Sequence, residues 1–367
     1  MPALNTSLHL IHDRLLGLYL KAFSHITKEE EQRALRIHRE AIVVDGLACP
    51  AVTRGEFDRM VQGGVTAANW TIASLGHDLG QTVRDMAVWY SLFRENNSKV
   101  MAIATAEDVR GAKKQNKLGV VFGLQDPKPI EEDVAILEVL HRLGARIIQL
   151  TYNERGLIGD GATEKTDSGL SRLGHNVVRE MNRLGILIDV SHCGRRTALE
   201  AIDTSREPVV FSHANAKALC NNPRNKSDEE IKAVAEKGGI IGAVAWGQLM
   251  WSKEGQQPTI DDFLNQIDYM VDLVGVNHVG IAMDISEGVF VGEKGKEASV
   301  AYDAKYPQVI ACWMTGDPSP GEAYTRDLGS YIQVPNITKG LVGRGYSDQD
   351  IKKILGENFL RVFEIVW

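Results

Sequence analysis

Cysteine is scarce in this sequence, and so are basic runs. Four cysteines occur among 367 residues, and their spacing matches neither a disulfide framework nor a CxxC zinc motif, which favours a reducing compartment. The formal net charge is −7 and no segment is dense in lysine or arginine, which argues against a nucleic-acid partner. We therefore predict a cytoplasmic protein whose partner is a small-molecule substrate.

Unbroken apolar runs of membrane-spanning length are also absent. The leucine-rich stretch Leu8–Phe23 is interrupted by charged residues such as Asp13 and Lys21, so it lacks the continuous apolar run of a secretory signal. Its apolar residues recur at helical spacing, which predicts an amphipathic helix that packs on the domain or on a partner subunit. We expect no membrane partner. Residues 1–40 should form N-terminal helices on a single domain that spans residues 41–367.

Short runs rich in β-branched residues alternate with helical patterns along the rest of the chain. The predicted strands are Ala41–Asp45, Val65–Trp70, Gly119–Leu124, Ile147–Thr151, Ile186–Val190, Val209–Ser212, Ile240–Ala245 and Val279–Met283. The predicted helices between them include Ile130–Leu143, Gly174–Leu184, Arg195–Ala201 and Asp228–Lys237. This alternation predicts an α/β fold, a closed (β/α)8 TIM barrel, with an open doubly wound sheet as the alternative. The irregular stretch Gly288–Gly321 should form a long loop after the last strand and act as an active-site lid.

Two Ser-His dipeptides follow two consecutive predicted strands. His192 and His213 are one βα repeat, 21 residues, apart in the chain. Neighbouring parallel strands lie about 5 Å apart, so both imidazoles can reach one ion. Neutral imidazole is a common zinc ligand, and the pair therefore predicts a metal site. The alternative is two buried histidines that hydrogen-bond to the backbone.

Two further charged residues follow predicted strands. Asp284 comes directly after the last strand, where a carboxylate can bind a metal or act as a general base toward an attacking water. Its alternative role is a helix cap or an ion pair. Arg224 lies in a Pro-Arg-Asn segment, and its planar guanidinium suits a substrate carboxylate. A structural ion pair is the alternative for Arg224.

Several long motifs resemble the membrane (renal) dipeptidase family, peptidase family M19. They are LTYNERGLIGDGATEKTDSGLSRLGHNVVREMNRLG, LIDVSHCGRRTALEAI, PVVFSHANAKALCNNPRNKSDEEI, HVGIAMDISEG and GENFLRVFEIVW. The resemblance extends from about Ala41 to the last residue. It implies an amidohydrolase-type TIM barrel that holds two zinc ions and hydrolyses dipeptides, including those with a D-residue at the C-terminal position. Members are often dimers, so a homodimer is expected.

The resemblance also implies roles for individual residues. His192 and His213 match the two histidines that bind one of the zinc ions. Asp284 matches the catalytic aspartate after the last strand. Arg224, with Asn225 beside it, matches the arginine that anchors the substrate carboxylate.

The sequence departs from the family at the second zinc. The family has Asp-Gly-His-Asn-Asp after the first strand, and the histidine and second aspartate bind that ion; Leu47 and Cys49 stand at these positions here. A bridging glutamate is replaced by Gln125, and a substrate-contacting histidine by Tyr152. Leucine cannot bind a metal, and a neutral amide cannot offset two cations. We predict that the dinuclear centre is absent, which leaves one zinc ion per chain or none.

The remaining ligand candidates are His192 and His213, with Gln125 or Asp284. Cys49 is either a thiolate ligand or a small buried side chain. The first functional hypothesis is a hydrolase of a dipeptide-like or other small carboxylate-bearing amide, with Asp284 as base and Tyr152 donating to the oxyanion. The alternatives are a divergent enzyme, through cyclic-amide hydrolysis or metal-free acid–base chemistry, and a non-catalytic small-molecule-binding homologue.

Overall fold

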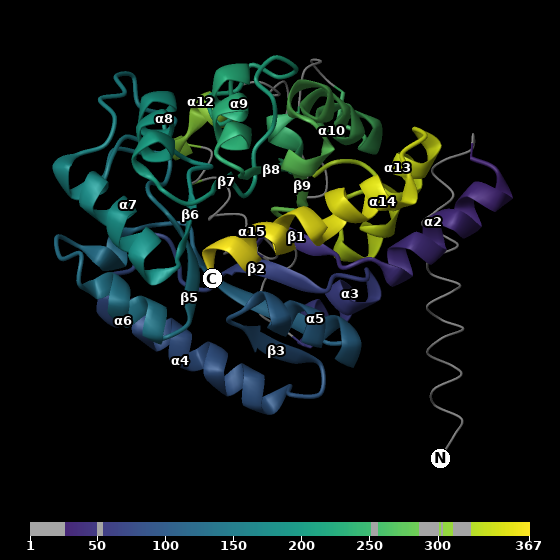
Figure 1. Ribbon diagram of the computed structural model, residues 1–367, viewed down its shortest axis with the longest axis horizontal. Helices are drawn as coiled ribbons and strands as arrows, with labels where there is room; N and C mark the ends of the chain where they lie inside the picture. Colours follow the sequence, from purple (N-terminus) through teal and green to yellow (C-terminus); the bar gives the residue numbers. More distant parts are fainter. Residues whose placement is uncertain (1–25, 50–53, 251–255, 286–300, 302–303, 311–323) are drawn as a thin grey trace.

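Eight parallel strands close into a barrel in the computed structural model of the protein (Figure 1). The structure describes every residue except 1–25, 50–53, 251–255, 286–300, 302–303 and 311–323. The strands of the ring are β1 (Val44–Ala48), β2 (Ala67–Thr71), β4 (Leu118–Leu124), β5 (Ala145–Gln149), β6 (Leu187–Asp189), β7 (Val209–Phe211), β8 (Ile240–Val244) and β9 (Val279–Ala282). Pairing of β1 with β9 and of β2 with β4 closes the ring. The predicted TIM barrel is therefore confirmed, and the open sheet is wrong.

The structure moves the bounds of several predicted strands and adds one strand. β2 begins two residues later than the predicted Val65–Trp70, and β5 covers Ala145–Gln149 in place of the predicted Ile147–Thr151. β1 begins three residues later than the predicted Ala41–Asp45 and ends at Ala48, because its pairing with β2 runs from Val44 to Ala48. A ninth strand, β3 (Val100–Ile103), was not predicted. It pairs with the first half of β4, while β5 pairs with the second half.

Helices surround the barrel. They are α2 (Lys28–Glu40), α3 (Arg54–Gln62), α4 (Leu79–Glu95), α5 (Ala106–Gln115), α6 (Ile136–Arg142), α7 (Arg172–Leu184), α8 (Arg195–Thr204), α9 (Asp228–Glu236), α10 (Ile260–Val274), α12 (Pro307–Ile310), α13 (Pro335–Gly343), α14 (Asp348–Lys352) and α15 (Asn358–Val366). Three of the four predicted helices are confirmed as α7, α8 and α9. The fourth, Ile130–Leu143, begins only at Ile136, because Glu131 adopts a positive φ of 54° that breaks the helix.

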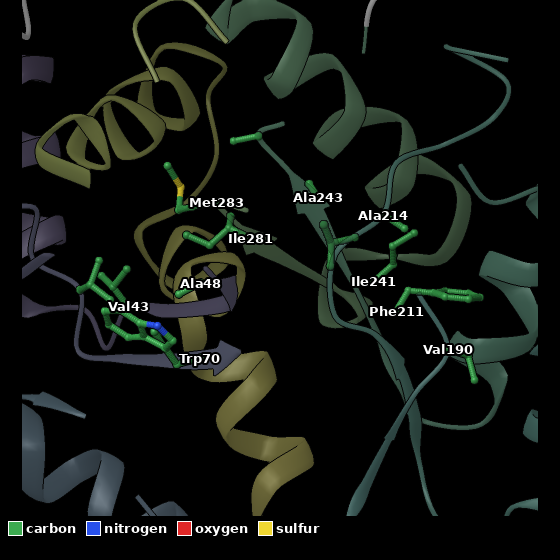
Figure 2. Close-up of a cluster of buried hydrophobic side chains, with 14 of the residues drawn as sticks. Val43, Ala48, Trp70, Val190, Phe211, Ala214, Ile241, Ala243, Ile281 and Met283 are labelled. Atoms are coloured by element: carbon green, nitrogen blue, oxygen red, sulfur yellow. The ribbon is translucent and has the colours of Figure 1, made fainter. Parts of the chain in front are cut away.

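Two apolar layers hold the barrel together. The outer layer lies between the strands and the helices, and Figure 2 shows part of it, with Trp70, Phe211 and Ile281 projecting from β2, β7 and β9. The inner layer lies inside the barrel at the start of the strands, where Phe359 and other side chains of α15 pack against strand residues such as Val44. Helix α15 thus covers the N-terminal end of the barrel (Figure 1). Active sites of this barrel fold lie at the opposite, C-terminal end of the strands.

The described part of the N-terminal region is α2. His38 on this helix contacts Thr338 on α13 through Nδ1 and Oγ1, 2.7 Å apart. The predicted helix Leu8–Phe23 and most of the predicted lid Gly288–Gly321 lie outside the described residues. Within the described ranges, no helix combines the length and the apolar character needed to cross a membrane.

Candidate active site

The two predicted histidines meet at the C-terminal end of neighbouring strands. Asp189 ends β6 and is followed by Val190, Ser191 and His192, while Phe211 ends β7 and is followed by Ser212 and His213. The Nε2 atoms of the two imidazoles are 2.9 Å apart, and both rings are buried. The two histidines are one βα repeat apart in the sequence. They contact each other in the structure because β6 and β7 are paired parallel strands.

Hydrogen bonds on the far side of each ring fix its orientation. Nδ1 of His192 lies 2.7 Å from Oδ1 of Asn153, and Nδ1 of His213 lies 2.7 Å from Oγ of Ser212. Tyr152 stacks on His192 with the ring centroids 4.2 Å apart and the planes 21° from parallel. Each Nδ1 is thus engaged with the protein, and each Nε2 is directed at the other ring.

Arg224 ties the two histidine-bearing loops together. Its side chain is only 1% exposed, and its guanidinium donates to the carbonyl oxygens of Ser191 and His213. Lys226 is also buried and donates through Nζ to the carbonyl oxygen of Cys193 at 2.8 Å. Burial lowers the pKa of both His192 and His213 well below the usual value, and the positive charge of Arg224 adds to this effect. The imidazoles are therefore neutral, which is the state that binds a metal ion.

Asp284 and Cys49 form a second part of the site, at the ends of β9 and β1. The Cys49 thiol donates to Oδ1 of Asp284 over 3.4 Å. Asp284 has a positive φ of 48°, and its backbone N–H donates to the carbonyl oxygen of Leu47 at 2.9 Å. Burial raises the pKa of Asp284 to about 6, against the lowering effects of the Cys49 hydrogen bond and the Arg224 charge.

Two other predicted residues make hydrogen bonds within the protein. Nε2 of Gln125 donates to Oγ1 of Thr71 at 2.7 Å. Nδ2 of Asn225 donates to the carbonyl oxygens of Cys220 at 2.9 Å and Leu249 at 2.8 Å. The Asn225 amide thus shapes the loop that carries Arg224.

Sequence reasoning missed Asp189, whose carboxylate accepts hydrogen bonds from the serines of both Ser-His dipeptides. Its Oδ1 accepts from the Ser191 backbone N–H at 2.9 Å, the Ser191 hydroxyl at 2.5 Å and the Ser212 backbone N–H at 3.1 Å. Its Oδ2 accepts from the Ser212 hydroxyl at 2.6 Å. Burial raises the pKa of Asp189 despite these bonds. The available signal was an aspartate within the otherwise apolar run Ile186–Val190.

The facing histidines are the part of the site that could hold a metal ion. Two facing Nε2 atoms on neutral imidazoles are two of the ligands that zinc takes in proteins. In the part of the chain that the structure describes, no group of three or more His, Cys, Asp or Glu side chains gathers at metal-binding spacing. The structure therefore does not bring Cys49 or Asp284 together with the histidine pair as a three-ligand group.

The sequence profile of the membrane dipeptidase family, peptidase family M19, matches residues 31–312 and 311–367. This chain belongs to that family. The expected resemblance is thereby confirmed across the barrel. An amidohydrolase from Pseudomonas aeruginosa has the same fold, with 33% identity and a TM-score of 0.81 over 91% of this chain and 99% of that one.

Two fungal dipeptidases are among the relatives of this family member. Dipeptidase tcpJ of Claviceps purpurea is 26% identical over 71% of this chain and 54% of its own length. Dipeptidase verJ of Clonostachys rogersoniana is 24% identical over 88% of this chain and 79% of its own length. The chain thus spans about half the length of tcpJ.

Proposed function

We propose that this dipeptidase-family member hydrolyses the amide bond of a dipeptide-like or other small carboxylate-bearing molecule, with at most one zinc ion held by His192 and His213. The observation that carries the proposal is the 2.9 Å separation of two Nε2 atoms on buried rings whose Nδ1 atoms are already engaged. When bound there, zinc supplies a Lewis acid that polarises a carbonyl oxygen and lowers the pKa of water. The names of the two fungal relatives support a dipeptide-like substrate.

The chain's own residues divide the remaining work. Asp284, at the barrel mouth, takes a proton from the attacking water. Tyr152, stacked on His192, donates its hydroxyl to the oxyanion that develops on the substrate carbonyl. Arg224 supplies a fixed positive charge that favours a carboxylate-bearing substrate. Its guanidinium also holds the two histidine loops at the spacing that the site needs.

A second candidate function is amide hydrolysis or proton transfer without a metal. It is favoured by the contact between Cys49 and Asp284, which places an acid–base pair at the barrel mouth independently of the histidines. Such chemistry suits small cyclic amides that need protonation more than strong electrophilic activation. A binding protein without catalysis is the third candidate.

Metal content and activity measured on the same preparation test the proposal. The protein is purified without added metal, zinc per chain is measured by elemental analysis, and dipeptides and small cyclic amides are screened before and after zinc addition. We expect about one zinc ion per chain, with dipeptide hydrolysis that a chelator abolishes. Activity that survives complete metal removal would favour the second candidate. Zinc binding without turnover of any substrate would contradict both enzymatic candidates.

A matched pair of histidine variants controls the measurement. His213→Ala removes one of the two facing Nε2 atoms and should release the zinc. His175→Ala removes a histidine on α7 whose Nδ1 contacts Thr204 at 2.9 Å, away from the strand ends, and should leave zinc content unchanged. Equal loss of zinc from both variants would mean that zinc binds elsewhere or that the fold is damaged.

A further inference from the structure

We propose that Asp189 is a positioning residue that fixes the tautomer of His213 through Ser212. In this tautomer the proton is on Nδ1, so that the Nε2 lone pair faces His192. The inference rests on the proposed function in one respect, since the ion that uses this lone pair is the proposed zinc. The tautomer itself is a property of the protein without metal.

The first step is that Asp189 uses up the hydroxyl protons of both serines. Ser191 Oγ lies 2.5 Å from Asp189 Oδ1, and Ser212 Oγ lies 2.6 Å from Asp189 Oδ2. Two backbone N–H groups and two hydroxyl groups converge on Asp189, and hydrogen bonds of this kind favour its ionised form. A carboxylate accepts hydrogen bonds and donates none, so each serine donates its single hydroxyl proton to it. The two serine oxygens are also 3.2 Å apart, but neither has a second proton for that contact.

The second step is that the Ser212 hydroxyl can only accept a hydrogen bond from His213. Its oxygen lies 2.7 Å from Nδ1 of that ring, and its proton already points at Asp189. The hydrogen bond therefore requires a proton on Nδ1 of His213. Neutral imidazole carries one proton, so Nε2 presents its lone pair.

The third step concerns the neighbouring ring. Nδ1 of His192 lies 2.7 Å from the amide oxygen of Asn153, which is an acceptor, so the His192 proton is on Nδ1 as well. Two lone pairs then face each other across 2.9 Å in a buried space. A single cation between them relieves this arrangement. Asp189 thus prepares His213 for an ion without touching its ring, as carboxylates behind metal-bound histidines do elsewhere, while Asn153 orients His192.

The variant Asp189→Asn tests the inference because asparagine has the same shape as aspartate but can donate a hydrogen bond. It should therefore reverse the direction of the hydrogen bonds that run from His213 through Ser212 to residue 189. The three donors at Oδ1 hold the amide oxygen of the new side chain in place. Its NH2 group then stands where Oδ2 was and donates to Ser212, whose hydroxyl proton turns to Nδ1 of His213. We expect the proton of His213 to move to Nε2, which removes the lone pair from the site.

Long-range 1H–15N correlation spectra of zinc-free protein with 15N-labelled histidine distinguish the two tautomers. The sequence has ten histidines, and the His213 signals are assigned by their disappearance in His213→Gln. Wild-type protein should show the Nδ1–H pattern for His213, and Asp189→Asn the Nε2–H pattern. A wild-type Nε2–H pattern, or an unchanged pattern in Asp189→Asn, would overturn the inference.

Two serine variants provide a matched control. Ser191 and Ser212 both donate to Asp189, but Ser212 alone of the two contacts an imidazole nitrogen. Ser212→Ala should release the His213 tautomer to a mixture, whereas Ser191→Ala should preserve the Nδ1–H pattern. Equal effects of the two variants on the tautomer would show that Asp189 acts only through general packing.

Zinc affinity, measured by competition with a chromophoric chelator, gives the second readout. Asp189→Asn and Ser212→Ala should weaken zinc binding by about tenfold or more, and Ser191→Ala by less than about threefold. Failure of wild-type protein to bind zinc would contradict the proposed function, while the tautomer spectra would still decide the role of Asp189. Zinc binding with unaltered affinity in Asp189→Asn would overturn the inference alone.

Discussion

Phe359 should be the most sensitive point of the barrel's closed end. This ring is 1% exposed and approaches three strand glycines, Gly46, Gly242 and Gly280. A methyl group added at Gly280 would lie 2.6 Å from Phe359 Cε2 and 3.0 Å from Cδ2, so the glycine makes room for the ring. Phe359→Ala removes this packing and leaves a cavity, and we expect a loss of about 3–5 kcal/mol in the free energy of unfolding.

A double-mutant cycle isolates this contact. Gly280→Ala alone forces the new methyl group against the ring and should cost about 1–3 kcal/mol. In the Phe359→Ala background both ring contacts vanish, and the nearest remaining atom is Ile240 Cγ2 at 3.4 Å. The cost of the double variant should therefore be smaller than the sum of the single costs by at least about 1 kcal/mol.

Urea unfolding, followed by circular dichroism and intrinsic fluorescence, measures each free energy. Gly111→Ala on α5 is the control, because its new methyl group would meet only Gln115 Nε2 at 3.8 Å, and its effect should add to that of Phe359→Ala. Additive costs for Gly280→Ala and Phe359→Ala would refute the proposed packing of Phe359 against Gly280. So would a loss below about 1 kcal/mol for Phe359→Ala.

Four other predictions concern the site and its supports. Asp284→Asn should abolish turnover and leave zinc content unchanged; residual turnover near the wild-type rate would rule out the base. Cys49→Ser should keep the hydrogen bond to Asp284 and retain zinc through dialysis, and zinc loss would instead make Cys49 a ligand. Arg224→Ala removes the buried positive charge, and it should raise KM more for a dipeptide than for its C-terminal amide; equal effects on both would exclude a carboxylate anchor. Burial raises the pKa of Asp45 to about 7, above the ordinary value of 3.8, so its stabilising contribution is complete below pH 3.8 and is lost as the pH rises through 7. Between pH 4 and pH 8, urea titrations should therefore show wild-type protein losing up to about 4 kcal/mol relative to Asp45→Asn, and parallel pH profiles would contradict this.

The sequence by itself determined the fold class and the family. Eight apolar runs with helices between them sufficed for the barrel, because buried parallel strands need continuous β-branched residues. The two Ser-His dipeptides identified the histidine pair for a related reason. The ends of neighbouring strands in a barrel lie together, so equal positions after two consecutive strands become adjacent in space.

Only the tertiary structure decided how the site is held. The sequence indicated Arg224 and Asn225 as substrate-binding residues, but their hydrogen bonds to backbone carbonyls depend on loops that fold against each other. The contact between Cys49 and Asp284 joins residues 235 positions apart. The four hydrogen bonds to Asp189 likewise require β6 and β7 to be paired first. Local patterns specify the elements, whereas the protons and lone pairs of a buried site are set by partners that are distant in the chain.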